Sequence, residues 1–142
     1  LANTPEAYER NLGALCTFRQ KELVTNSLDM VLTKDVRAQD GPRQIGRLLA
    51  SSWGRSLAWQ FLNQNWEALA KKFDAKHLPH LIEAAGNFNS EEDLKNLNEF
   101  VGRHPLPNGR RSVAQTIETV QIRLNFRQKQ MPDLLKYLKE NK

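Results

Sequence analysis

The sequence predicts an all-α protein, an α-solenoid of about seven to eight antiparallel helices stacked in pairs. Three observations support this class. Apolar residues recur at helical spacing along nearly the whole chain, no strand-like alternation survives, and the connections are short. The pairs recur about every 35 to 40 residues, near the length of a HEAT-type unit. A chain of 142 residues is large enough for a single domain with its own core, which we assign to residues 1–142.

The first half of the chain has the signals of four helices. Thr4 is a suitable N-cap and Pro5 a suitable first residue for the opening helix. Asp40 or Gly41 is expected to cap the third helix, after a polar connection. The sequence SSWG interrupts the apolar pattern before the fourth. We therefore expect helices over residues 5–16, 20–33, 42–49 and 55–73.

The second half predicts further helices with clear boundaries. Gly86 suits the C-terminal end of a short helix, and Ser90 with Asp93 three residues later is a typical helix start. Pro132 is expected to begin a separate last helix, because proline fits the first helical turn. In that helix the leucines at positions 134, 135 and 138 are expected to face inward. We therefore expect helices over residues 77–86, 90–102, 112–130 and from 132 onward.

The helix over residues 55–73 carries two tryptophans, Trp59 and Trp66, seven residues apart and so on one face. Aromatic rings at this spacing either line a groove or fill a core. Here the apolar stripe is too broad for a groove-lining helix, so we assign it to the core. The expected core residues of this helix are Trp59, Phe61, Leu62, Trp66, Leu69 and Phe73.

Charge is unevenly distributed along the chain. The net charge is +5, and the stretch from Arg103 to Lys129 holds six basic residues against the single acidic residue Glu118. Such a stretch suits nucleic acid, another anionic partner, or simply a solvated helix face. Exposed aromatic residues are not interleaved with these basic residues, so we expect no nucleic-acid partner. The apolar runs are also too short for a membrane-spanning helix, so no membrane partner is expected.

No catalytic motif is visible in the sequence. It has no HExxH, no GxSxG, no P-loop and no GxGxxG. His77, His80 and Glu83 have a spacing that suits a metal, but Pro79 between them makes a continuous helix there doubtful, and we expect no metal site. Cys16 lies among apolar residues, as inert buried thiols do, and a lone cysteine favours a reducing compartment such as the cytoplasm.

Several segments resemble, in the right order, the C-terminal domain of one enzyme family. "LGALCTFRQKELVTNSLDMVL", "VRAQD", "LAWQFLNQNWEALAKKF", "SVAQTIETVQIRLNF" and "LLKYLKENK" are similar to this domain in zinc metallopeptidases of the aminopeptidase N, puromycin-sensitive and endoplasmic reticulum aminopeptidase family. The resemblance spans nearly all of the chain. One departure is Phe126, where many relatives have tryptophan.

This resemblance implies a non-catalytic, HEAT-like domain at the C-terminal end of a larger enzyme that removes N-terminal residues from peptides. Its partners would be an upstream catalytic domain, which holds the zinc, and peptide substrates. The chain itself would bind no cofactor, contain no catalytic residue, and shape the chamber above the active site. Some relatives hold the peptide carboxylate with an arginine. Thr17 stands at that position here, so the resemblance transfers this role to no residue.

Three other arginines are candidates for binding a peptide carboxylate: Arg43, Arg47 and Arg55. The alternative is that they are solvated or paired with Asp35 and Asp40. The sequence also leaves a second function open, that of a free-standing α-solenoid module that binds peptides or proteins.

Overall fold

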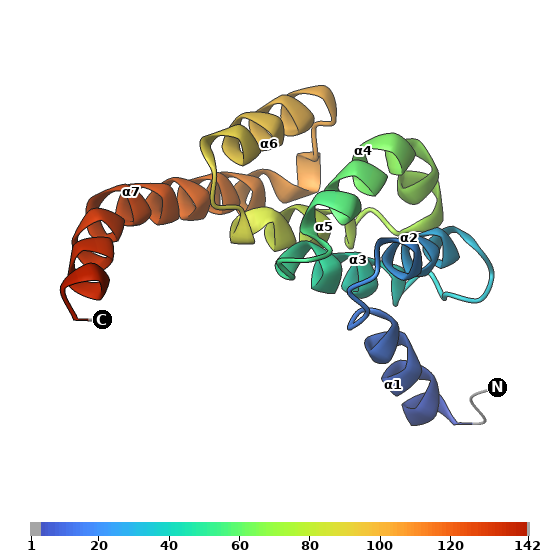
Figure 1. The fold of residues 1–142 in the computed structure, drawn as a ribbon. Helices are drawn as coiled ribbons and strands as arrows, with labels where there is room; N and C mark the ends of the chain where they lie inside the picture. Colours follow the sequence, from blue (N-terminus) through green and yellow to red (C-terminus); the bar gives the residue numbers. More distant parts are fainter. Residues whose placement is uncertain (1–3, 142) are drawn as a thin grey trace.

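The computed structural model describes residues 4–141, and within them the chain forms seven α-helices and no strand (Figure 1). The prediction of an all-α helical-repeat fold is confirmed. The helices are α1 (Pro5–Leu15), α2 (Lys21–Asp29), α3 (Gly41–Ala50), α4 (Arg55–Lys72), α5 (Leu78–Ala84), α6 (Glu91–Arg103) and α7 (Arg110–Glu140). Short 3-10 helices follow α2 (η1, Met30–Leu32) and α5 (η2, Ala85–Asn87) and precede α7 (η3, Pro107–Gly109).

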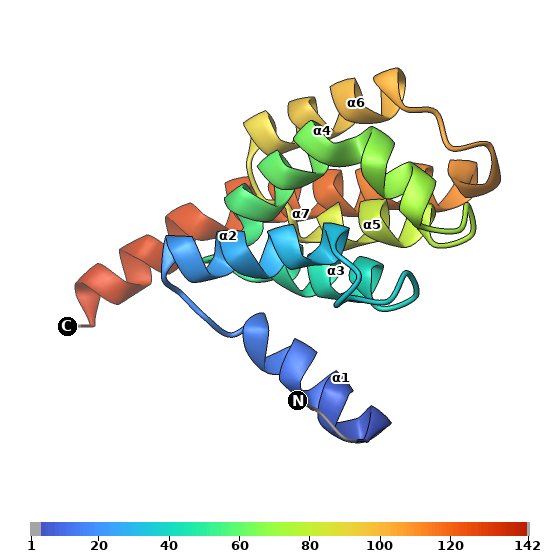
Figure 2. The ribbon, with the colours of Figure 1, turned by 90° about the vertical axis from the view of Figure 1, so that its right-hand side faces the viewer.

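The helices from α2 onward are arranged in two rows. Figure 2 shows α2, α4 and α6 in one row and α3, α5 and α7 in the other. The contacts agree with this arrangement, because α3 packs on α5, α5 on α7 and α2 on α4, while α3 with α4 and α6 with α7 join the rows. The helices of the first row begin at residues 21, 55 and 91, a repeat of about 35 residues, which is typical of stacked helix pairs.

Local sequence signals explain where two of the helices begin. The Oγ1 atom of Thr4 accepts a hydrogen bond from the Ala7 amide at 3.2 Å, with Pro5 in the first turn of α1. The Oγ atom of Ser90 accepts one from the Asp93 amide at 3.1 Å, at the start of α6. The N-caps predicted at Thr4 and Ser90 are therefore present, whereas the Asp40 side chain, at the N-cap position of α3, makes no capping hydrogen bond.

One continuous core lies between the two rows. Its members include residues of every helix from α2 to α7, so the helix pairs share a single apolar interior. Nearly all of the side chains expected from the sequence to fill the core on α4 and its end are buried, and Trp59 is half-buried against the same cluster. The buried ones are Phe61, Leu62, Trp66, Leu69 and Phe73.

Aromatic rings join α4 to the α6 region. Trp59 lies edge-on to Phe88 with ring centroids 5.0 Å apart, and Trp66 lies edge-on to Phe100, also at 5.0 Å. Phe100 additionally contacts the rings of Trp59 and His104. Edge-to-face pairs at these distances add to the stabilisation from burying the rings. The two tryptophans thus pack against rings of α6 and of the segment that precedes it.

The expectation of a separate last helix beginning at Pro132 is wrong. Pro132 lies inside α7, which runs unbroken for 31 residues. Proline removes one backbone hydrogen bond and bends a helix, and Figure 1 shows the axis of α7 turning in its C-terminal part. The leucines expected to face inward are about half exposed, at 48% for Leu134 and 50% for Leu135 and Leu138, because none of the other helices within residues 4–141 covers this end of α7.

Helix α1 is attached to the stack mainly through polar contacts. The Tyr8 hydroxyl donates to the Asp35 carbonyl at 2.9 Å and accepts from the Arg37 amide at 3.2 Å. The Arg37 guanidinium also lies over the Tyr8 ring, 4.4 Å from its centroid. Leu12 is the one buried residue within α1, and Figures 1 and 2 show the helix standing away from the two rows.

A lysine from a distant helix also holds the connection between η1 and α3. The Lys72 ammonium, at the end of α4, donates to the carbonyls of Val31, Thr33 and Val36 at 2.6, 2.5 and 2.8 Å. Burial lowers the pKa of this ammonium group. Three backbone carbonyl groups in and after η1 are therefore satisfied by one side chain from a distant helix.

Candidate functional site

The candidate arginines Arg43 and Arg47 lie one turn apart on the exposed face of α3. The opposite face of α3 carries Ile45, Leu48 and Leu49, which are fully buried, so packing of the helix fixes the direction in which the arginines project. Among residues 4–141, no carboxylate oxygen lies within 4.0 Å of either guanidinium. Two positive charges at i and i+4 repel each other and favour a bound anion between them.

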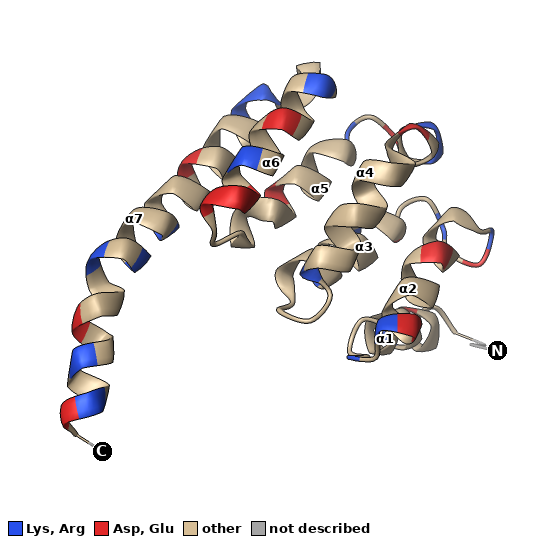
Figure 3. Cartoon of the chain, turned by 45° about the horizontal axis from the view of Figure 1, so that its top comes forward, with Lys and Arg blue, Asp and Glu red and all other residues tan. Residues whose placement is uncertain are grey.

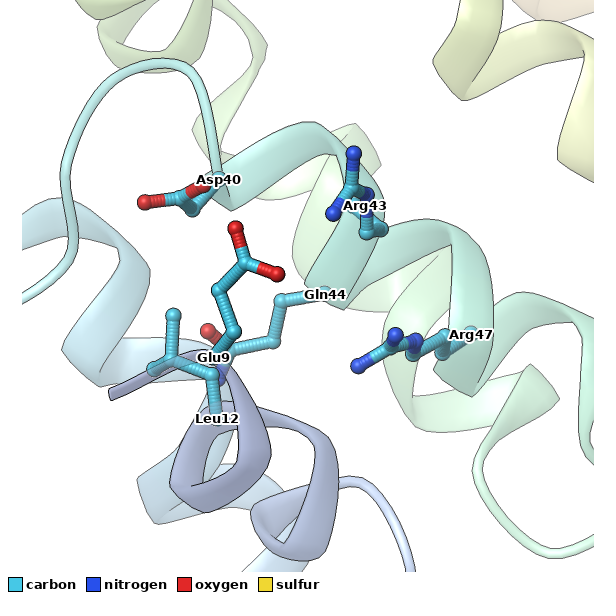
Figure 4. A pocket seen from close by; sticks show the side chains of 6 residues that line it. All are labelled: Glu9, Leu12, Asp40, Arg43, Gln44 and Arg47. Carbon is cyan, nitrogen blue, oxygen red and sulfur yellow. The ribbon is translucent and has the colours of Figure 1, made fainter. Parts of the chain in front are cut away.

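A small pocket lies between α1 and α3 (Figure 4). Arg47 points into it, and Gly13 of α1 lies so close that a Cβ atom there would stand 2.9 Å from Arg47 Nη1. Asp40, at the start of α3, accepts a hydrogen bond from Arg37 Nε at 2.6 Å. The pocket is therefore polar and charged on both sides. Its lining residues are Glu9, Leu12, Asp40, Arg43, Gln44 and Arg47.

A larger hollow of about 560 Å³ opens on the other side of the same two arginines. It lies between α3 and the start of α5, and its lining combines apolar surface with the polar groups of Gln39, the two arginines and two histidines. A volume of this size suits a few side chains of an extended ligand. The lining residues are Gln39, Pro42, Arg43, Gly46, Arg47, Ala50, His77 and His80.

The third candidate, Arg55, lies away from this pair. It is the first residue of α4, and its Nε atom donates to the Leu49 carbonyl at 3.2 Å, near the end of α3. One of its donors therefore closes the turn between the two helices. The guanidinium of Arg19 lies over the Trp53 ring, 5.1 Å from its centroid. The structure thus brings Arg43 and Arg47 together and does not add Arg55 to them.

Of the two histidines beside the hollow, His80 is paired with a carboxylate, that of Glu83. His80 Nδ1 lies 2.8 Å from Glu83 Oε2, and hydrogen bonds from His80 and Ser112 lower the pKa of Glu83. The rings of His77 and His80 have centroids 6.2 Å apart. Within residues 4–141, no group of three histidine, cysteine, aspartate or glutamate side chains is placed to hold a metal ion.

Cys16 is buried at the end of α1. Burial raises the pKa of its thiol, although the charge of Arg47 acts in the opposite direction. A thiol that stays protonated is a poor nucleophile, so this environment suits a packing role. The sulfur lies 3.5 Å from the Leu12 carbonyl and 3.7 Å from that of Gln44, which adds a weak contact between α1 and α3.

The expectation that no exposed aromatic residue lies among the basic residues of the second half is wrong, because Phe126 on α7 is 68% exposed. Several of these basic residues form contacts within the chain. Arg123 donates to Asn87 Oδ1 at 3.1 Å and Arg127 to the Asn89 carbonyl at 3.0 Å, while Arg103 donates to Asn63 Oδ1 at 3.3 Å. Acidic and basic residues alternate near the end of α7 (Figure 3).

Across the part of the chain that is described, no helix combines the length and the apolar character that crossing a membrane requires.

Sequence reasoning missed Gln44, which is 2% exposed and lines the pocket between α1 and α3. A signal was present, because Gln44 lies four residues before Leu48 on the buried face of α3. A polar side chain on an apolar stripe needs hydrogen-bond partners inside the fold, so its presence there indicates a buried polar contact.

The comparison with protein families decides what kind of domain this is. Residues 2–122 match the model of the ERAP1-like C-terminal domain. The chain belongs to this family. The resemblance found in the order of the sequence segments is thus confirmed over most of the chain.

Individual proteins that are similar to the chain agree with this family assignment. The chain is 32% identical to aminopeptidase M1 of Arabidopsis thaliana over 120 residues, which cover 82% of the chain and 13% of the relative. It is 31% identical to aminopeptidase M1-B of Oryza sativa subsp. japonica over 123 residues, 84% of the chain and 14% of the relative. It is 29% identical to human endoplasmic reticulum aminopeptidase 1 over 135 residues, which cover 91% of the chain and 14% of the relative. The chain spans about one seventh of the length of these curated relatives.

Proposed function

We propose that this domain is the non-catalytic C-terminal part of a zinc-dependent aminopeptidase that removes N-terminal residues from peptides. The observation that carries the proposal is the family match over residues 2–122 with relatives named aminopeptidases, each about seven times as long as the chain. In this proposal the parent's upstream catalytic domain holds the zinc and cleaves the peptide, while the helical stack, with HEAT-like pairs, shapes the chamber and limits access to it.

The face of α3 is the part of the domain that we propose contacts peptide. Arg43 and Arg47 present two guanidinium groups without a carboxylate partner among the described residues, beside a hollow wide enough for side chains. A guanidinium binds a carboxylate through two parallel hydrogen bonds, and two of them one turn apart suit an anionic end of an extended peptide. Arg55 contributes less, since its Nε atom is already bonded to Leu49.

The size of the native polypeptide tests the parent enzyme. An antibody against this chain should detect, in extracts of the source cells, a band several times larger than 16.3 kDa. A native band of 16.3 kDa would contradict the proposal, because no catalytic domain would then accompany the chain. That result would favour the second candidate, a free-standing α-solenoid module that binds peptides or proteins through the same hollow.

The purified chain tests the non-catalytic role. We expect no hydrolysis of aminoacyl fluorogenic substrates, with or without added zinc, and no stoichiometric zinc after dialysis. Zinc-dependent hydrolysis by the pure chain, abolished by a chelator and absent from a mock purification, would contradict it.

Peptide binding is tested at the two arginines. We expect a labelled peptide with a free carboxylate to bind the double variant Arg43→Ala, Arg47→Ala at least about tenfold more weakly than it binds the unchanged chain. A loss of this size corresponds to the removal of a charge-assisted hydrogen bond. A peptide amidated at its C-terminus should not distinguish the two proteins. Arg111→Ala, an exposed arginine on α7, is the matched control. Equal loss in this control would indicate only a change in overall charge.

A further inference from the structure

The pocket between α1 and α3 contains a buried acceptor without a hydrogen bond. Gln44 is 2% exposed, and its Nε2 atom donates to the Ser27 carbonyl at 2.6 Å. This bond fixes the orientation of the amide, because the reverse orientation would place two acceptors against each other. Its Oε1 atom has no partner among the described residues. Leaving such a buried acceptor unbonded is unfavourable, so a donor is expected there.

The pocket is large enough for one small molecule and no more. Its volume is about 20 Å³, just above the roughly 10–15 Å³ that one water molecule requires. In Figure 4 the Gln44 amide reaches into this space, with Glu9 from α1 and Arg47 from α3 beside it. An internal water needs two to four polar partners, about the number that these three side chains supply.

The charges around the pocket select a neutral occupant. Arg43 and Arg47 disfavour a cation, while the carboxylates of Glu9 and Asp40 and the amide oxygen of Gln44 disfavour an anion. A neutral molecule that both donates and accepts hydrogen bonds can bond to the guanidinium groups and to the carboxylate and amide oxygens. Water is the molecule of this class that the volume admits.

We propose that one ordered water molecule binds in this pocket and joins α1 to α3. It donates to Gln44 Oε1 and to the Glu9 carboxylate, and it accepts from the Arg47 guanidinium. Helix α1, which has one buried residue of its own, is thereby attached to the stack partly through bound water. This inference does not depend on the proposed function, because it concerns only how α1 is held.

A high-resolution crystal structure of the full chain tests the water directly. We expect a density peak at hydrogen-bond distance from Gln44 Oε1. In solution, water-selective nuclear Overhauser experiments should show a cross-peak between a long-lived water and the methyl protons of Leu12, which lines the same pocket. An empty pocket in which Arg47 donates directly to Gln44 Oε1, with no such cross-peak, would overturn the proposal.

Variants link the water to its partners. Gln44→Met should abolish the cross-peak, whereas Gln60→Met, on the exposed side of α4, should leave it intact. Because Gln44→Met also removes the bond to Ser27, Arg47→Met provides a second test that leaves that bond in place. We expect it to weaken the cross-peak by removing the donor to the water. An unchanged cross-peak in both Gln44→Met and Arg47→Met would show that the water is not bound at this acceptor.

Discussion

The middle of the stack and its two ends are held together by different interactions. Between α4 and α6, Trp59, Trp66 and Phe100 pack ring against ring. At the N-terminal end, α1 is attached by polar contacts and by Leu12, and at the C-terminal end the last part of α7 has no covering helix. We therefore expect the free energy of local unfolding to be highest in the middle of the stack and lower at each end.

The largest expected effect is at the centre of the aromatic cluster. Phe100→Ala should lower the free energy of unfolding by about 3–5 kcal/mol, because it leaves a cavity facing both tryptophans. Urea denaturation followed by tryptophan fluorescence measures this. Phe126→Ala is the matched control, since that ring is 68% exposed on α7, and its effect should stay within about 0.5 kcal/mol. Similar losses in both variants would remove the distinction between middle and end.

A smaller and more local effect is expected at the N-terminal end. Leu12→Ala should cost about 2 kcal/mol, the low end of the range for a buried leucine, because α1 can detach without unfolding the stack. The buried Cys16 thiol reports this opening. Its reaction with a thiol reagent should accelerate in Leu12→Ala and not in Leu23→Ala, an exposed leucine of α2. If labelling instead followed global unfolding in urea, α1 would be an integral part of the stack.

The same contrast separates what the sequence could predict from what it could not. Helix boundaries set by a local cap, such as those at Thr4 and Ser90, were predictable because the capping side chain lies within three residues of its partner. Whether Pro132 begins a helix or lies inside one was not predictable, since proline suits both the first turn of a helix and a bend within a helix. What decides between them is whether another helix covers the residues that follow, and that depends on the whole stack.

The candidate site was partly predictable for a similar reason. Arg43 and Arg47 stand four residues apart on one helix, so their closeness follows from helical geometry alone. Lys72 and the carbonyls that it binds are separated by 36 to 41 residues, and Gln44 lies 17 residues from Ser27. Contacts across such distances arise from the packing of helices and carry no short-range pattern.

Two caps extend the comparison between middle and end. Ser90→Ala removes a hydrogen bond at the start of α6 and should lower global stability by about 1 kcal/mol. Thr4→Ala removes the equivalent bond from α1 and should change global stability less, while speeding amide hydrogen exchange within α1. Hydrogen exchange followed by mass spectrometry measures both. Equal global losses would show that α1 and α6 unfold together.

The smallest expected effect is a pH dependence at Glu83. Its pKa is lowered in the folded chain by His80 and Ser112, so the folded state favours the ionised carboxylate more than the unfolded state does. The resulting stability is present above the ordinary pKa of 4.5 and is lost as the pH falls through the lowered value. The side chain is 43% exposed, so solvent screening keeps the contribution small. Glu83→Gln should flatten the loss of stability in acid. An unchanged acid profile would contradict this origin.

The three carbonyls around Lys72 have a consequence for which residues position 72 can hold. Val31, Thr33 and Val36 surround one ammonium nitrogen much as the oxygens of a crown ether surround an ion. A guanidinium is planar and presents its donors as a fork, so it does not reproduce a point charge with three donors. Exchange of lysine for arginine, ordinarily a mild change near the end of a helix, is here a replacement of one coordination geometry by another.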